Sequence, residues 1–253
     1  MDLKKNKILF DNCKIYSDVN EFLSYTSKKK VLWYVKKGLA DIIKSTDDEV
    51  SIKLKFKPKH NNIQKHPYNT GVKDNKCAVC ACVGNLTTHH IVPYEYRKVL
   101  DSKYTNHNSY DIIGLCVDCH IKYESHAMIY KKYLIDSLVP NYYISLYNDW
   151  LNINRIYEKI DDIGEDIDML TNKFLSKKIQ KVLDVWCGLL TYSDFINMEL
   201  IPINKYIINV LGSETLIKMW QYHFIEYAQP KYMPDWWVVG KIYVSNNQQV
   251  INI

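Results

Sequence analysis

Two Cys-x-x-Cys pairs constrain the fold of this chain more than any other feature. Cys77 and Cys80 form one pair, and Cys116 and Cys119 form the other. Each pair can make a tight turn that offers two thiolates to one ion, and two such turns complete a tetrahedral zinc site. A redox-active pair would need a thioredoxin-like setting, which the sequence lacks. The spacing therefore predicts a structural Zn²⁺ ion, whose binding contributes on the order of 10–16 kcal/mol to the folding of a short segment.

The composition is that of an ordinary globular protein. The chain has 253 residues, of which 47% are hydrophobic and 24% charged, so it can bury a core of one large domain or two small ones. No apolar run approaches the length of a bilayer span, and the lysine-rich start lacks the apolar stretch of a signal peptide. We expect no membrane association and an intracellular protein, located in the host cytoplasm or the virion if the source is viral. Among the seven cysteines, Cys82 is a spare beside the first pair, either a small buried residue or an exposed one.

Positive charge is concentrated just before the cysteine region. Residues Ser51–Lys76 contain seven lysines and one aspartate, a balance that suits contact with a phosphate backbone. The chain also has only two arginines and many Lys, Asn, Ile and Tyr residues. An AT-rich genome would produce that usage by codon bias, so both explanations of the basic stretch stay open.

Hydrophobic periodicity predicts an α+β protein with three regions. Residues 1–70 are expected to form a small β-α-β unit with a basic linker, with a helix over Lys28–Lys44, a strand over Val50–Phe56 and Trp33 in the core. Residues 71–138 form the zinc-bound core. Residues 139–253 are expected to be mainly helical, and the segments with this periodicity are Tyr143–Ile160, Ile167–Leu190 and Leu216–Tyr227, followed by a possible strand over Trp236–Val244.

Three histidines lie within or directly beside the segment that the cysteine pairs enclose. His89 and His90 are neighbours on an expected strand, so their side chains point to opposite faces. One imidazole could bind a divalent ion together with His120, while the other takes a proton from an attacking water. The alternative is that one of them is a further zinc ligand or a core residue.

These motifs resemble the zinc-clamped HNH, or ββα-metal, endonucleases. The resemblance rests on Cys-x-x-Cys, then His89-His90-Ile91-Val92-Pro93, then the run from Asp111 to His120. It implies that His89 and His120 bind a catalytic Mg²⁺ or Mn²⁺ ion and that His90 is the general base. The family's middle Asn falls on Asp111, a departure, since an ionised carboxylate accepts hydrogen bonds but cannot donate them. Asp111 would orient His90 or approach the metal, or else Asn106 or Asn108 would hold the loop in its place.

A longer resemblance runs in order from about Ile8 to about Leu138. Segments such as Lys29–Leu39, Ile52–Pro58, Ile91–Lys98 and His107–Asp111 are similar to the region after the exonuclease domain in a family of 3′-5′ exonuclease domain proteins. The exonuclease domain itself is not found in this sequence. Arg97 and Lys98 follow the histidine turn and would contact nucleic acid, or Arg97 would pair with Glu95 or Asp101.

The sequence therefore predicts a metal-dependent endonuclease that hydrolyses phosphodiester bonds in DNA in preference to RNA. The main alternative is a catalytically inactive zinc module that binds nucleic acid or a protein partner. A third reading is a structural protein that assembles through its helical tail.

Overall fold

The computed structural model describes residues 8–46, 49–57, 67–105, 111–161, 177, 179–182, 184, 198–243 and 250–251. The chain divides into two compact units, one formed by Met1–Ile129 with Ser213–Ile253 and the other by Tyr130–Gly212. Asn106, His107 and Asn108, and most of the predicted helix Ile167–Leu190, lie outside the described residues.

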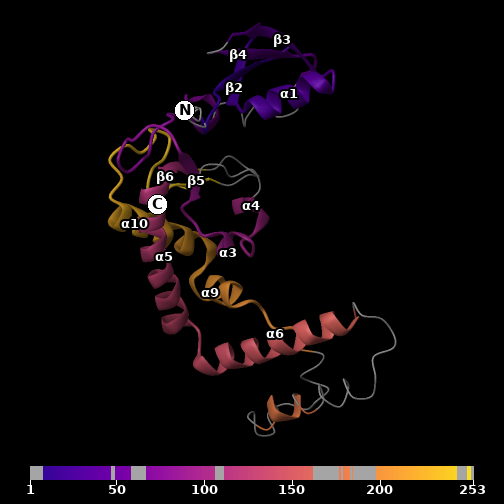
Figure 1. Cartoon of the computed structure of the whole chain (residues 1–253), viewed down its shortest axis with the longest axis vertical. Coiled ribbons are helices and arrows are strands. Elements are labelled where there is room, and N and C mark those ends of the chain that lie inside the picture. The colour runs from indigo at the N-terminus through magenta and orange to yellow at the C-terminus, as the bar shows by residue number, and fades with distance from the viewer. Residues whose placement is uncertain are drawn as a thin grey trace, which may run out of the picture. The chain divides into compact units, whose positions relative to one another are not determined.

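The first part of the chain forms a four-stranded sheet with one helix (Figure 1). Its elements are β1 (Cys13–Tyr16), β2 (Phe22–Thr26), α1 (Lys28–Lys36), β3 (Ala40–Ser45) and β4 (Val50–Leu54). The strand order is β2-β1-β4-β3, with β1 and β4 parallel and the other pairs antiparallel. The unit thus has two more strands than the predicted β-α-β arrangement, because β2 and β3 pair at the two edges of the sheet.

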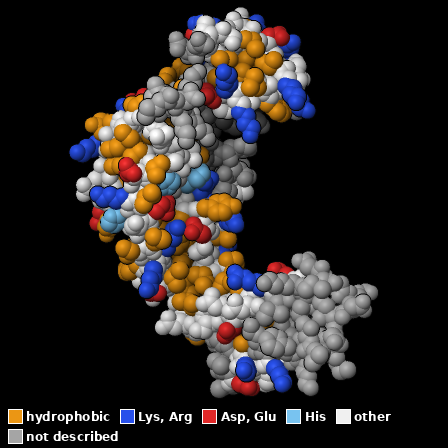
Figure 2. Space-filling view, viewed as in Figure 1, with side chains coloured by type: hydrophobic (Ala, Val, Ile, Leu, Met, Phe, Trp, Pro, Cys, Tyr) orange, Lys and Arg blue, Asp and Glu red, His pale blue; other side chains and the backbone are white. Residues whose placement is uncertain are grey.

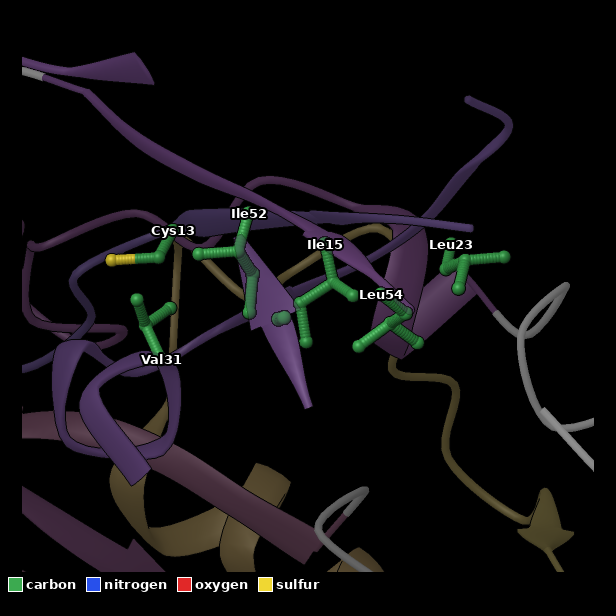
Figure 3. Close-up of a cluster of buried hydrophobic side chains, with 7 residues drawn as sticks. Cys13, Ile15, Leu23, Val31, Ile52 and Leu54 are labelled. Atoms are coloured by element: carbon green, nitrogen blue, oxygen red, sulfur yellow. The ribbon is translucent and has the colours of Figure 1, made fainter. Parts of the chain in front are cut away.

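One face of this sheet packs against α1 (Figure 3). Alternate residues of β1 and β4, such as Ile15 and Ile52, point into the core, and Val31 of α1 covers them. This alternation is the period-2 pattern of a half-buried strand. The predicted strand over Val50–Phe56 is observed as β4.

The predicted helix over Lys28–Lys44 is wrong in its second half. Ser27 caps the helix by accepting a hydrogen bond from the Lys30 amide, but α1 ends at Lys36. Gly38 then adopts a φ of +68°, a left-handed conformation that glycine reaches without steric cost and that stops a helix. The chain turns back, and Ala40–Ser45 pairs with β4 instead.

The prediction that Trp33 is a core residue is also wrong. Its side chain is 51% exposed, because Val31 and not Trp33 faces the sheet. The predicted apolar face that contains Val31 and Val35 does pack on the sheet; only the assignment of Trp33 to the core is wrong.

The central region contains two antiparallel strands followed directly by a long helix. Its elements are α2 (Pro67–Thr70), β5 (Leu86–His90), α3 (Tyr94–Arg97), α4 (Ser102–Thr105), β6 (Ile112–Cys116) and α5 (Val117–Leu138). In the β5–β6 pair His89 lies opposite Ile113 and Leu86 opposite Cys116. Because α5 starts at the residue after Cys116, the strand end and the first helical turn hold the second cysteine pair.

The end of the chain packs back onto this region. Helix α10 (Ser213–Ala228) buries Trp220 and Phe224 completely, and Tyr96 of α3 packs 5.7 Å from the Trp220 ring. Of the described residues in the predicted strand over Trp236–Val244, only Ile242–Tyr243 (β7), paired with Val250–Ile251 (β8), form a strand. Trp236 and Trp237 are 7% and 8% exposed, so both are core residues.

The second unit is helical in its described part. Helix α6 (Asn141–Asp161) confirms the predicted helix over Tyr143–Ile160, and α9 (Ile203–Leu211) follows later in the chain. Tyr143 and Trp150 of α6 donate hydrogen bonds of 2.8 Å to the carbonyls of Ile201 and Met198. Across the described residues, no helix combines the length and apolarity that crossing a membrane requires.

Candidate metal and catalytic site

His89 and His90 point to opposite faces of β5, as the strand geometry predicts. His89 is only 2% exposed, and its ring stacks 5.7 Å from Phe224 of α10 and lies edge-on to Tyr123 of α5. His90 is half-buried on the other face, beside Arg97 of α3. The two imidazoles therefore work in different surroundings, one packed in the interior and one next to a cation.

On the His89 side, two ring nitrogens and a carboxylate converge. His89 Nδ1 lies 3.1 Å from His120 Nε2, and Glu124 Oε1 lies 3.5 Å and 3.6 Å from these two atoms. A point equidistant from all three atoms lies about 2.0 Å from each, within the ligand distances of Zn²⁺ and Mg²⁺. The three residues can therefore hold a divalent ion.

Thr87 fixes the orientation of the His120 ring. Its hydroxyl donates to the Leu115 carbonyl at 3.1 Å and lies 2.8 Å from His120 Nδ1. Since the hydroxyl proton is already used, the Thr87 oxygen accepts from Nδ1–H. The neutral imidazole then carries its lone pair on Nε2, the atom that faces His89 and Glu124. A hydrogen bond from the other ring nitrogen, such as this one to Thr87, typically orients a histidine that binds a metal.

The metal-binding group opens to solvent through a surface hollow of about 360 Å³. Its lining includes His120, Glu124 and Thr87, and the other lining residues, all of α5, are Val117, Ile121, Ser125 and Met128. A ligand of an ion bound there could reach the site from outside the protein.

On the opposite face of β5, Arg97 contacts the His90 ring and favours its neutral form. A guanidinium nitrogen contacts His90 Nδ1, and because the guanidinium has only donors, Nδ1 is the acceptor. Burial, helped by the neighbouring Arg97 charge, lowers the pKa of His90 to about 4. The imidazole is thus neutral at physiological pH. Lys98 follows Arg97 in the chain, and its Nζ lies 4.7 Å from the centre of the Tyr94 ring.

Asp111 holds the turn that follows the histidine pair. Its backbone carbonyl accepts from the Ile91 amide at 3.1 Å, and its carboxylate accepts from the Val92 amide at 3.0 Å. These two bonds tie Asp111 to the backbone of the turn, which is none of the three roles expected from the sequence, and those roles stay predictions. Burial raises the pKa of Asp111 to about 7, against the opposing effects of the Val92 amide and Arg97.

The cysteines gather into one group that could hold a metal ion. The sulfur atoms of Cys77, Cys80, Cys82 and Cys116 all lie within 4.8 Å of one another. Cys119 stands beside them, with its amide donating to Cys116 Sγ at 3.5 Å. Cys82, taken from the sequence as a spare, is therefore a fifth thiol of the cluster, although its side chain is exposed.

Two residues of the site were missed from the sequence. Glu124 follows His120 by four residues on α5, a spacing that places both side chains on one helix face, so the His-x-x-x-Glu pattern was the available signal. Thr87 precedes His89 by two residues and shares its strand face. Neither residue type is distinctive enough alone to have marked the site.

Several relatives that this chain matches are named for a 3′-5′ exonuclease domain. It is 30% identical over 112 residues to Exonuclease 3'-5' domain-containing protein 2 of Homo sapiens, covering 44% of this chain and 18% of the relative. The Mus musculus protein of the same name is 24% identical over 267 positions, covering 96% and 39%. For the Drosophila melanogaster protein the identity is 23% over 259 positions, covering 93% and 44%.

The chain thus spans less than half the length of these relatives. The longer matches extend over almost the whole chain, beyond the stretch from Ile8 to Leu138 on which the sequence resemblance rested. No protein-family model matches the chain, and no solved structure matches it significantly.

Proposed function

We propose that this protein is a metal-dependent nuclease of the HNH (ββα-metal) type, which hydrolyses phosphodiester bonds in nucleic acid, DNA in preference to RNA. One observation carries the proposal. On one side of β5, the potential ligand atoms of His89, His120 and Glu124 lie 3.1, 3.5 and 3.6 Å from one another, close enough to share one ion. His90 is the next residue of the strand and faces the other way. The relatives named for an exonuclease domain support a substrate that is nucleic acid.

The metal-binding residues fit a hard or borderline divalent cation. Two neutral imidazoles and one carboxylate suit Mn²⁺, Mg²⁺ or Zn²⁺, and the hollow that His120 and Glu124 line leaves room for water ligands of the ion. A cation bound there supplies electrostatic stabilisation to the charge that develops on the phosphate and leaving oxygen. His89 and His120 position it, and Glu124 contributes the negative charge.

His90 is the proposed general base. In the structure its Nδ1 lone pair is occupied by Arg97. A phosphodiester that enters the site offers Arg97 a bidentate anionic partner, which guanidinium prefers. When Arg97 turns to that phosphate, Nδ1 becomes available to accept a proton from the attacking water. Arg97 then has two roles, shielding the base in the free protein and binding substrate in the complex, while Lys98 adds positive charge.

Asp111 and the cysteine cluster are the proposed supports of this site. Asp111 braces the turn after His90. A Zn²⁺ ion held by Cys77, Cys80, Cys116 and Cys119 would join the loop before β5 to the junction of β6 and α5. Since β5 carries both histidines and α5 carries His120 and Glu124, this ion would hold the two halves of the site together.

The direct test is cleavage of plasmid, single-stranded DNA and RNA by the purified protein with Mg²⁺ or Mn²⁺. His90→Ala should fold and bind nucleic acid but cut about 10²- to 10⁴-fold more slowly, the usual loss for a positioned general base. His126→Ala, which changes a histidine of α5 that stacks on Tyr227, is the matched control and should cut normally. Cleavage by His90→Ala at the parent rate would refute the base assignment. A parent protein that binds zinc and nucleic acid but never cuts would favour the non-catalytic zinc module.

A further inference from the structure

Helix α1 presents a lysine-rich face with an exposed tryptophan at its centre. Residues 28–37 contain five lysines and no acidic residue. Trp33 is 51% exposed and Leu32 55% exposed. We call the surface formed by Lys29, Lys30, Trp33, Lys36 and Lys37 the Trp33 patch. In Figure 2, blue side chains border hydrophobic ones on the part of the molecule that carries α1.

The geometry of a helix places the four lysines around the indole. Lys29 and Lys30 lie one turn before Trp33, and Lys36 and Lys37 one turn after it. At 3.6 residues per turn all four project within about 60° of Trp33 around the axis, and the two pairs are about 10 Å apart along it. Val31, on the opposite side, is the residue buried against the sheet. The patch is therefore the outer face of α1 and is not needed for packing.

The lysines of the patch differ from those of the neighbouring sheet in their pairing. On the sheet, Lys44 pairs with Glu49 and Lys55 with Asp41. Among the described residues, no carboxylate pairs with Lys29, Lys30, Lys36 or Lys37, and all four are exposed. Their charge is thus available to an anionic partner.

We propose that the Trp33 patch binds single-stranded nucleic acid, with an unpaired base stacked on the Trp33 indole and neighbouring phosphates contacting the lysines. Aromatic rings bordered by basic side chains are the common means of binding single strands, because every base has a face that can stack and every nucleotide carries a charge. This binding surface goes beyond the proposed nuclease activity and does not depend on it.

The arrangement of the patch argues against a lipid surface as the partner. A helix that lies in a membrane interface separates a broad apolar face from a charged one. In α1 the exposed tryptophan and the four lysines share a single face, so burying the indole in acyl chains would bring the charges with it. A stacking surface bordered by positive charges fits a nucleotide chain better, because bases and phosphates alternate along it.

The test uses full-length His90→Ala protein, so that no substrate is cut, with a labelled short oligothymidine and a hairpin-closed duplex. Trp33→Ala should weaken oligothymidine binding about 5- to 100-fold, the range expected for one stacked base, and Trp33→Phe should restore most of it. Duplex binding should change much less, because paired bases present no free face. Circular dichroism and thermal melting should show both variants folded, since the side chain is half exposed.

Charge is tested with a matched pair of double variants. Lys29→Gln with Lys36→Gln should reduce the slope of log affinity against log salt by about 1.4, as two lost contacts to a single strand predict. Lys44→Gln with Lys55→Gln removes the same charge from paired lysines and should reduce it less. Equal effects of the two pairs, or an unchanged affinity of Trp33→Ala for oligothymidine, would overturn the proposal. The parent and Trp33→Ala are also mixed with anionic vesicles, and a Trp33→Ala variant that lost binding to the vesicles but not to oligothymidine would overturn the proposal as well. Because cleavage is absent from every arm, failure here leaves the nuclease proposal untouched.

Discussion

Glu124 follows His120 by one turn of α5, and its carboxylate oxygen lies 3.6 Å from His120 Nε2 and 3.5 Å from His89 Nδ1. The helix thereby delivers two groups to an ion from one rigid face, and β5 delivers the third.

Replacing this carboxylate should weaken metal binding. Glu124→Gln keeps the size of the side chain but removes its charge, and we expect the dissociation constant for Mn²⁺ to rise by more than about 10-fold. Isothermal titration on zinc-loaded protein measures this directly. Asp136→Asn, an exposed acid further along α5, is the control for charge. If both variants bound Mn²⁺ like the parent, Glu124 would not be a ligand.

Thr87 should act through the orientation of His120. Thr87→Val keeps the shape of the side chain but removes the oxygen that accepts from His120 Nδ1. We expect Mn²⁺ affinity to fall by about 10-fold, as for other second-layer partners of metal-binding histidines, with the protein still folded. Thr87→Ser restores the hydroxyl and should restore affinity. Equal weakening by both variants would point to lost packing and not to a lost hydrogen bond.

The carboxyl of Asp111 should make stability depend on pH. Its pKa is raised to about 7 from an ordinary value of 3.8, so the folded protein binds this proton more tightly than the unfolded chain does. The resulting stabilisation is fully present at low pH and is lost as pH rises through about 7.

Asp111→Asn keeps an oxygen that can accept from the Val92 amide and has no charge to bury. The variant should match the parent near pH 4 and exceed its free energy of unfolding at pH 8 by about 1–3 kcal/mol. Urea unfolding at several pH values measures the difference. A control is Asp18→Asn, an exposed carboxylate. A pH-independent difference would contradict the role assigned to burial.

The five-thiol cluster gives a prediction about which sulfurs bind zinc. Cys116→Ser should lose zinc and lower the melting temperature sharply, because the ion joins the two halves of the site. Cys119→Ser should do the same, whereas Cys82→Ser should keep one zinc per chain. Metal analysis after gel filtration distinguishes them. The reverse ranking of Cys82 and Cys119 would assign Cys82 as the fourth ligand, as its position among the clustered sulfurs allows.

Much of the local structure near the histidine pair follows from the sequence. A strand must send neighbouring side chains to opposite faces, so the division of His89 from His90 needs no tertiary information. The alternation in Val50–Leu54 predicts β4 for the same reason. The spacing of Cys77, Cys80, Cys116 and Cys119 predicts a common ion because short turns bring paired sulfurs together.

Where local patterns compete, prediction from the sequence fails. The apolar residues from Val31 to Ile42 fit a helix by period, yet Gly38 ends it and β4 recruits Ala40–Ser45, since a strand gains its hydrogen bonds from a partner distant in sequence. Trp33 is apolar but lies on the outer face, because burial depends on which side of α1 meets the sheet.

The sequence by itself determined which chemical groups the protein has and which of them share a strand or a helical turn, because those relations depend only on backbone geometry over a few residues. Only the tertiary structure decided that the Glu124 carboxylate lies beside His89 Nδ1 and that Arg97 contacts His90 Nδ1. It also decided that the Trp33 patch faces solvent. Each of these depends on how strands and helices far apart in the chain pack against one another, and packing is settled by the whole core at once.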